Sequence, residues 1–150
     1  MERLIDSFTG DDAFLSNFFA ARMDFEGAYY PTSEHAYQAS KTMSRIWRTK
    51  IATAPTSRIA KQLGRKAPLR HDWPMVKVPI MRAVVRAKFT QHPELAKMLL
   101  ATGDAQLIEG NTWNDAVWGC IRDQTGAWKG QNWLGRILME VREELRKVKV

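Results

Sequence analysis

Apolar residues recur at helical spacing along the C-terminal segment of the chain. Leu134, Ile137, Leu138, Val141 and Leu145 fall on one stripe, charged residues occupy most other positions, and basic residues gather near the end. This pattern predicts an amphipathic helix that packs one face against a core.

Three earlier segments combine helix start or stop signals with apolar spacing. They are 56–64, with Thr56 as N-cap and Gly64 as its end, 79–88, opened by Pro79, and 93–103, opened by Pro93 and stopped by Gly103. After the first of these helices we expect a loop that carries Arg65, Lys66 and Arg70.

Other parts of the chain lack helical spacing. Residues 4–30 are irregular or strand-like, and within them 23–30 alternates apolar and polar residues about Glu26-Gly27, which is typical of a short β-hairpin. Residues 104–132 contain glycines and tryptophans but little periodicity. The whole pattern predicts an α+β fold, a predominantly α-helical single domain over 1–150 with a few short strands.

A further helix start follows the hairpin directly. Thr32 or Ser33 can serve as N-cap, which leaves Glu34 in the first turn. At 3.6 residues per turn, Glu34, Gln38 and Lys41 share one face, with Glu34 and Lys41 ~10 Å apart along the axis. The two charged groups could therefore bind two ends of one ligand. The alternative is that Glu34 is only a capping carboxylate on a solvated helix.

Composition limits the class of protein. The 150 residues suit one domain, and no apolar run reaches the ~18 residues of a membrane span, so we expect no membrane association. The N-terminus does not resemble a signal peptide, and the single cysteine agrees with a cytoplasmic location. Three histidines without paired spacing predict no metal site, and the absence of nucleotide-binding glycine motifs predicts no cofactor.

The net charge of +7 favours phosphates, nucleotides or nucleic acid as partners, and six tryptophans offer surfaces on which bases stack. Polar side chains stand among aromatic ones in 15–18, 70–73 and 111–119. A base attached to a sugar phosphate needs this combination, with Arg65 or Lys41 for the phosphate.

Cleavage of an N-glycosidic bond builds positive charge on the sugar, so a carboxylate near the anomeric carbon would stabilise the transition state or activate water. Glu34 and Asp115 are the two candidates for this carboxylate. Asp115 has an alternative reading as a turn residue that binds its own backbone. The order of the two as acid and base depends on their surroundings.

Several blocks of the sequence occur together in one known family. The chain resembles the NADAR family, the YbiA-like N-glycosidases, over nearly its whole length through seven blocks: 14–18, 31–41, 63–65, 70–73, 81–89, 114–119 and 129–142. The resemblance implies metal-free hydrolysis of an N-glycosidic bond in phosphoribosylamino-pyrimidine intermediates of riboflavin synthesis. Some relatives instead remove ADP-ribose from guanine bases of nucleic acid, so the expected partner is a ribosyl-phosphate or ADP-ribosyl substrate, with ADP-ribosylated nucleic acid as a further possibility.

The family pattern also implies roles for individual residues. Matched residue by residue, the catalytic set is Glu34, Asp115 and Lys41, and the substrate-binding set is Asn17, Phe18, Gln38, Arg65, Trp73, Trp118 and Asn132. Glu34 would be the base or charge stabiliser, and Trp73 and Trp118 would frame the base. Lys41 would bind phosphate with Arg65, or form a Schiff base with an opened ribose.

One segment departs from the family pattern. Relatives commonly follow Trp-Gly with Asp and a glycine-rich loop, whereas here Trp118-Gly119 leads into 120–129. Asp123 could replace the missing acid, or the loop could shape access, and Cys120 is expected to be a packed residue.

Two other classes of function stay open. A non-catalytic nucleic-acid-binding module is supported by the net charge and by the grouping of Arg82, Arg86 and Lys88. A sensor of ADP-ribose or a related nucleotide would bind its ligand without forming product.

Overall fold

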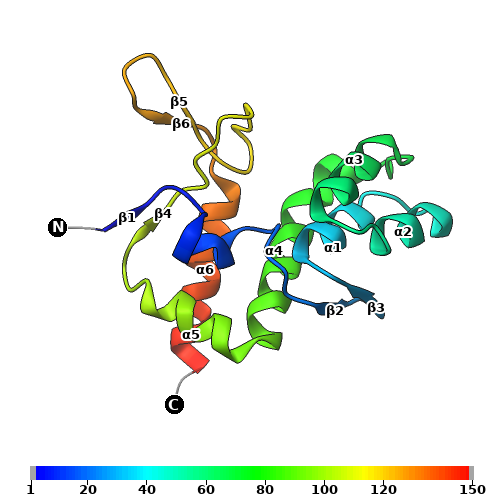
Figure 1. Cartoon of the computed structure of the whole chain (residues 1–150), viewed down its shortest axis with the longest axis horizontal. Helices are drawn as coiled ribbons and strands as arrows, with labels where there is room; N and C mark the ends of the chain where they lie inside the picture. The colour runs from blue at the N-terminus through cyan, green and yellow to red at the C-terminus, as the bar shows by residue number, and fades with distance from the viewer. Residues whose placement is uncertain (1–2, 149–150) are drawn as a thin grey trace. The chain divides into compact units, whose positions relative to one another are not determined.

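In the computed structural model, which describes residues 3–148, the chain forms two compact units. One unit comprises Asn17–His92, and the other joins the segment that ends at Ser16 to the segment that begins at Pro93 (Figure 1). Helices dominate both units and the strands are short, which confirms the predicted α+β class. The single domain over 1–150 stays a prediction.

The Asn17–His92 unit begins with the predicted hairpin. Strands β2 (Met23–Phe25) and β3 (Ala28–Tyr30) pair antiparallel. The two turn residues Glu26 and Gly27 have φ of 49° and 80°, the left-handed conformations that a tight two-residue hairpin turn requires. The alternation of the strands buries Met23, Phe25 and Tyr30 against the helices.

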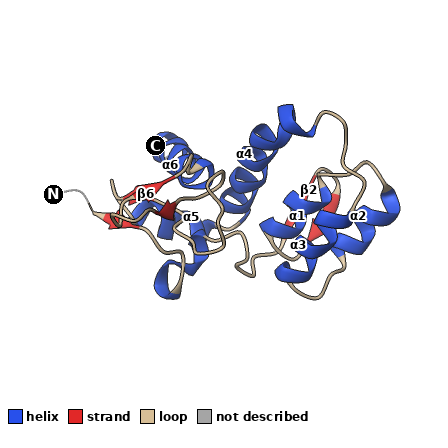
Figure 2. Cartoon of the chain, turned by 90° about the horizontal axis from the view of Figure 1, so that it is seen from above, coloured by secondary structure: helices blue, strands red, loops and turns tan. Residues whose placement is uncertain are grey.

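Four helices follow the hairpin. They are α1 (Ser33–Ala39), α2 (Arg45–Ala52), α3 (Ser57–Lys66) and α4 (Trp73–Gln91). The side chains of Thr32, Ser44 and Thr56 accept backbone N–H groups in the first turns of α1, α2 and α3. Of the two predicted candidates for the α1 cap, Thr32 is the cap and Ser33 is the first helical residue, and the cap predicted at Thr56 is confirmed. Helices α1, α2 and α3 pack against one another in pairs (Figure 2).

The predicted end of α3 and the predicted start of α4 are wrong. Helix α3 continues through Gly64 to Lys66, so Arg65 and Lys66 lie in its last turn instead of a loop. Helix α4 begins at Trp73, with Pro74 in its first turn, and Pro79 lies inside it. Pro74 lies in the first turn, where a helix tolerates proline best, so it suits the start of α4. Pro79 lies further along the helix and removes one backbone hydrogen bond without ending it. Helix α2 was not predicted. Only Ile51 of its residues is buried, so the helix has no broad apolar face that the sequence pattern could indicate.

The core of this unit uses small side chains where helices approach closely. Its buried residues come from the hairpin, the four helices and the loop after α2: Met23, Phe25, Tyr30, Ala36, Ala39, Ile51, Ala54, Ala60 and Val84. Alanine on α1 and α3 allows these two helices to approach closely enough for the functional side chains between them to meet.

The other unit is built around the C-terminal helix. Helix α6 (Trp133–Val148) buries Leu134, Ile137, Leu138 and Val141, which confirms the predicted apolar stripe. It packs against α5 (Pro93–Ala101) and β4 (Gln106–Leu107), and β4 pairs in parallel with β1 (Leu4–Ile5). A 3₁₀ helix, η1 (Gly10–Leu15), follows β1, and β5 (Ile121–Arg122) pairs antiparallel with β6 (Trp128–Lys129).

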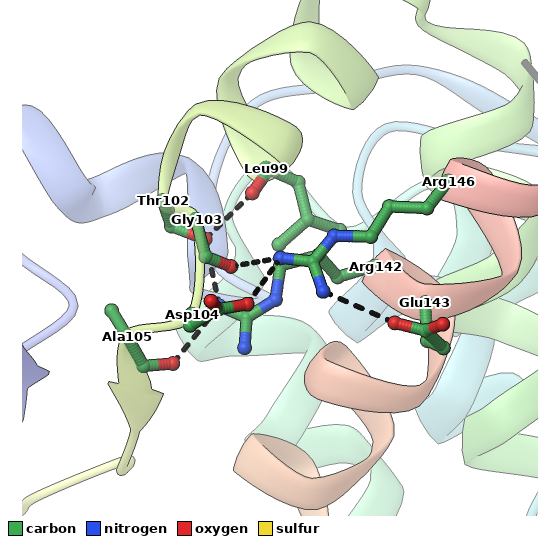
Figure 3. A network of polar contacts seen from close by, with 8 residues as sticks. All are labelled: Leu99, Thr102, Gly103, Asp104, Ala105, Arg142, Glu143 and Arg146. Atoms are coloured by element: carbon green, nitrogen blue, oxygen red, sulfur yellow. Dashed lines mark hydrogen bonds and ion pairs between the residues drawn. The ribbon is translucent and has the colours of Figure 1, made fainter. Parts of the chain in front are cut away.

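Arginines of α6 satisfy the carbonyl groups at the end of α5 (Figure 3). Buried Arg142 donates from Nη1 to the Thr102 hydroxyl and to the Ala105 carbonyl, each at 2.9 Å. Arg146 donates to the Gly103 carbonyl and forms an ion pair of 2.9 Å with Asp104. These contacts fix the turn after α5 to the C-terminal helix.

Among the residues from 3 to 148, no helix combines the length and apolar character needed to cross a membrane.

Candidate active site

Glu34 lies in the first turn of α1, largely withdrawn from solvent. Its side chain and backbone together are 7% exposed. Its backbone N–H donates to the Asn17 carbonyl at 3.0 Å, and its carboxylate Oε2 accepts a hydrogen bond of 2.6 Å from Gln38 Nε2, one turn later on the helix. The helix therefore holds the carboxylate in a defined orientation near its positive end.

Gln38 links this carboxylate to the neighbouring helix. It is 2% exposed, and within residues 3–148 its Oε1 is a buried polar atom without a hydrogen-bond partner. A Cβ at position 64 would collide with Oε1 and Cδ of Gln38. Gly64 is therefore a packing residue inside α3 that lets this helix approach α1.

Asn17 supports the start of α1 from outside the helix. Its Oδ1 accepts the Ser33 hydroxyl at 2.9 Å, and its Nδ2 lies 3.3 Å from the sulfur of Met81 on α4. These contacts make Asn17 a residue that positions the backbone of Glu34. Phe18 next to it is 44% exposed, and Lys61 Nζ lies 5.9 Å from the centre of its ring.

Lys41 lies in the same region, although α1 ends at Ala39 and Lys41 therefore does not continue the helical face as predicted. Its Nζ is 5.6 Å from the centre of the Tyr37 ring. Burial lowers the pKa of Lys41, Glu34 opposes this effect by favouring the charged amine, and the positive charges of Arg65 and Lys61 lower the pKa further. One carboxylate and two further cations thus act electrostatically on the Lys41 amine.

Lys61 belongs to this cluster but is not among the residues predicted from the sequence. Lys61 and Arg65 are four residues apart on α3, so they lie on one face of that helix. This i, i+4 spacing was the available signal, but ending the helix at Gly64 concealed it.

Trp73 lies beside α1. Its ring centre is 5.3 Å from that of Tyr37, and the planes are inclined by 54°. The turn before Trp73 is held by an Arg70–Asp72 ion pair of 2.6 Å and by the Arg70 N–H, which donates to the Lys41 carbonyl at 2.8 Å. The structure therefore brings Trp73 together with the segment that carries Glu34, Gln38 and Lys41.

The histidine that follows Glu34 has a structural environment. His35 is buried, its Nδ1 is 2.7 Å from the Thr32 hydroxyl and its Nε2 is 2.9 Å from the Ala54 carbonyl. Burial lowers its pKa, which favours the neutral imidazole. Within residues 3–148 no three His, Cys, Asp or Glu side chains form a group that could hold a metal ion.

The remaining predicted site residues, Asp115, Trp118 and Asn132, belong to the other unit. Asp115 Oδ1 accepts the backbone N–H groups of Val117 at 3.0 Å and Trp118 at 2.9 Å, the geometry of a turn residue. Asn132 donates to the Leu107 carbonyl at 2.9 Å and accepts from the Glu109 N–H at 3.1 Å. Both ends of its amide thus join the residue before α6 to β4 and to the segment that follows β4.

The segment that departs from the family pattern forms the β5–β6 hairpin. Asp123 Oδ1 accepts the Thr125 hydroxyl and the backbone N–H groups of Thr125 and Ala127, which closes the turn. The Thr125 hydroxyl, with these backbone donors, lowers the pKa of Asp123. Cys120 is buried, and burial raises the pKa of its thiol, as for a packed residue.

Comparisons with known proteins agree over nearly the whole chain. The model of the NADAR domain family matches residues 7–146. "N-glycosidase YbiA" of Escherichia coli (strain K12) is 44% identical over 140 residues, which cover 91% of this chain and 84% of that protein. "N-glycosidase Npun_R5314" of Nostoc punctiforme is 39% identical over 139 residues, which cover 89% of this chain and 86% of that protein.

A longer relative and a solved structure extend the comparison. "Riboflavin biosynthesis protein VVA0006" of Vibrio vulnificus is 41% identical over 151 residues, which cover 98% of this chain and 40% of that protein. The NMR structure of the E. coli protein YbiA superimposes with a TM-score of 0.82 at 40% identity, covering 100% of this chain and 90% of that one.

Proposed function

Because this chain belongs to the NADAR domain family, we propose that it is an N-glycosidase, a hydrolase acting on the phosphoribosylamino-pyrimidine intermediates of riboflavin biosynthesis. The names of its relatives, N-glycosidases and a riboflavin biosynthesis protein, support this assignment. The observation within the chain that carries it is the buried, oriented Glu34 carboxylate beside the cations Lys41, Arg65 and Lys61. We place the protein in the cytoplasm, because a chain with a single cysteine suits a reducing compartment.

The chemistry needs a carboxylate near the anomeric carbon. As the bond between C1 of the ribose and the base nitrogen breaks, its electron pair leaves with the nitrogen, which is protonated, and positive charge grows on the sugar. The Glu34 carboxylate stabilises this charge or takes the proton of the water whose oxygen bonds to C1. The hydrogen bond from Gln38 keeps the carboxylate aligned for either role.

The cations define where the phosphate binds. A phosphate monoester is doubly charged near neutral pH, and Lys41, Arg65 and Lys61 supply the positive charge in the same unit as Glu34. Trp73 provides a flat surface for the base beside Tyr37. The roles that the family pattern implies for Asp115, Trp118 and Asn132 stay predictions.

A second substrate class uses the same groups. A diphosphate also matches a cluster of three cations, so removal of ADP-ribose from guanine bases of nucleic acid is the alternative reaction. The lowered pKa of Lys41 favours a larger fraction of neutral amine than an exposed lysine has, which supports Schiff-base formation with an opened ribose as an alternative step.

The test is release of ribose 5-phosphate from the diaminopyrimidine intermediate by the wild type and by Glu34→Gln, with ADP-ribosylated guanine DNA as a second substrate. Glu94→Gln is the matched control, because Glu94 also lies in the first turn of a helix but is exposed. Substitution of Glu34 should lower kcat at least ~100-fold, the size of a lost acid–base contribution, while Glu94→Gln leaves it unchanged.

Each outcome decides between the functions. Turnover of the pyrimidine substrate that depends on Glu34 supports the proposal, and turnover of the DNA alone selects the ADP-ribosyl reaction. If the folded wild type cleaves neither, or if Glu34→Gln is as active as Glu94→Gln, the catalytic assignment fails. Steeply salt-dependent binding without product would then identify a nucleic-acid-binding module.

A further inference from the structure

A cavity lies wholly within the unit that contains α6. It has a volume of about 570 Å³, which is in the range of pockets that bind small molecules. The segment after β1, the 110–114 segment and the β5–β6 hairpin line it through Asp6, Ser7, Asn114, Ile121, Arg122 and Trp128, among others. None of the residues assigned above to catalysis or substrate binding is among its lining residues.

One wall of this cavity is formed by Arg122 stacked on Trp128. Arg122 and Trp128 are paired across β5 and β6, and the guanidinium carbon lies 4.1 Å from the centre of the indole ring. The indole N–H donates to Asp6 Oδ2 at 3.1 Å, and Arg122 Nη2 lies 3.5 Å from the same oxygen. A Cβ at position 110 would collide with the indole, so Gly110 allows the ring to lie against the backbone.

The polar groups of the wall define what could bind. The side chain of Arg122 is 54% exposed and presents a planar cation, a surface on which bases stack. The side chain of Asp6 is 33% exposed and offers only hydrogen-bond acceptors, so it favours a donor such as an amino group. The lining holds one positive and one negative side chain, Arg122 and Asp6, and therefore has no net charge with which to hold a phosphate.

We propose that this cavity binds a nucleobase that carries an exocyclic amino group. The base stacks on the Arg122–Trp128 pair, and its amino group donates to Asp6. Thr112 and Asn114 add polar side chains to the lining, and Asn114 has a left-handed backbone conformation with φ of 67°. This cavity shares no lining residue with the proposed glycosidase site, and nucleobase binding here does not depend on glycosidase activity.

The test compares cytidine, uridine and cytidine monophosphate by titration of ¹⁵N-labelled protein. The readout is the indole N–H resonance of Trp128, identified by its loss in Trp128→Phe. Cytidine should shift this resonance saturably and bind about tenfold more tightly than uridine, which presents a carbonyl oxygen in place of the amino group to Asp6. The monophosphate should bind no more tightly than cytidine, in contrast to a site made of cations.

Variants separate this site from the rest of the molecule. Asp6→Asn should abolish the preference for cytidine over uridine, and Arg122→Gln should weaken cytidine binding about tenfold through loss of stacking. Arg136→Gln is the matched control, because Arg136 stacks on Trp133 at 3.9 Å outside the cavity, and it should leave binding unchanged. Glu34→Gln should also bind cytidine as the wild type does.

The proposal is overturned if cytidine and uridine bind equally, if the phosphate alone determines affinity, or if folded Arg122→Gln binds cytidine as the wild type does. Should Asp6→Asn fail to give the amide spectrum of the folded protein, Arg122→Gln and the comparison of nucleosides on the wild type still decide the question. Failure of this proposal with Glu34-dependent turnover intact leaves the glycosidase assignment unaffected.

Discussion

Substitution of Gly64 by alanine tests whether contact between α1 and α3 orients the proposed catalytic carboxylate. The new Cβ would collide with Oε1 and Cδ of Gln38, and both residues are buried, so Gln38 cannot turn into solvent. The collision must therefore displace the amide whose Nε2 holds Glu34 at 2.6 Å. We expect Gly64→Ala to lower both stability and turnover.

The magnitude follows from three effects. Alanine favours a helix over glycine by about 1 kcal/mol. Overpacking of a filled site costs about 1–3 kcal/mol, and loss of a hydrogen bond to a charged group costs about 1.5–3 kcal/mol. The free energy of unfolding of Gly64→Ala should therefore fall by about 1.5–5 kcal/mol, measured by urea denaturation. Misplacement of Glu34 should lower kcat by up to ~100-fold and change KM less, because the cations remain.

A double variant isolates the collision. Gln38→Ala removes the atoms that the new methyl group would strike, so Gln38→Ala/Gly64→Ala should be more stable than Gly64→Ala alone and yet as slow as Gln38→Ala. The reasoning is refuted if Gly64→Ala is at least as stable as the wild type, or if removal of the Gln38 amide restores no stability.

Three further predictions follow from the same structure. Lys61→Ala should raise KM about tenfold for a phosphorylated substrate but not for the corresponding nucleoside, and equal effects on both would remove Lys61 from the phosphate site. Arg142→Met leaves the Ala105 carbonyl and the Thr102 hydroxyl without their donor and should lower the free energy of unfolding by about 2–4 kcal/mol; a urea midpoint equal to that of the wild type would contradict this. Burial lowers the pKa of Lys88 from 10.5 to about 7, so between these pH values the unfolded chain binds more protons and stability should rise by up to ~1.4 kcal/mol per pH unit. Lys88→Met should flatten this rise in thermal melts between pH 7 and pH 9, and an unchanged slope would assign it to another group.

Local signals in the sequence predicted local structure well. Thr32 and Thr56 cap helices because a hydroxyl and the N–H groups of the next turn are close along the chain. Glu26-Gly27 forms the hairpin turn because only left-handed conformations match the twist of the strands. The stripe on α6 is buried because apolar residues on one helical face can leave water only together.

Signals that depend on distant partners were misread. Gly64 resembles a helix end in the sequence, but the close approach of Gln38, 26 positions earlier, is what requires a glycine there. Pro79 resembles a helix start, although Trp73 and Pro74 begin α4. The i, i+4 spacing of Lys61 and Arg65 is a local signal, but the effect of Lys61 on Lys41 exists only because α3 packs on α1.

The sequence by itself determined the family, the α+β class and the segment that carries Glu34, because a motif and a helix start are properties of neighbouring residues. Only the tertiary structure decided that Gln38, packed against Gly64, orients the Glu34 carboxylate. The same is true of the electrostatic effect of Lys61 on Lys41, and of the hydrogen bond from the Trp128 indole to Asp6. Each of these depends on the distance between side chains that are far apart along the chain. Packing sets such distances, and burial then sets the strength of the hydrogen bonds and charges involved.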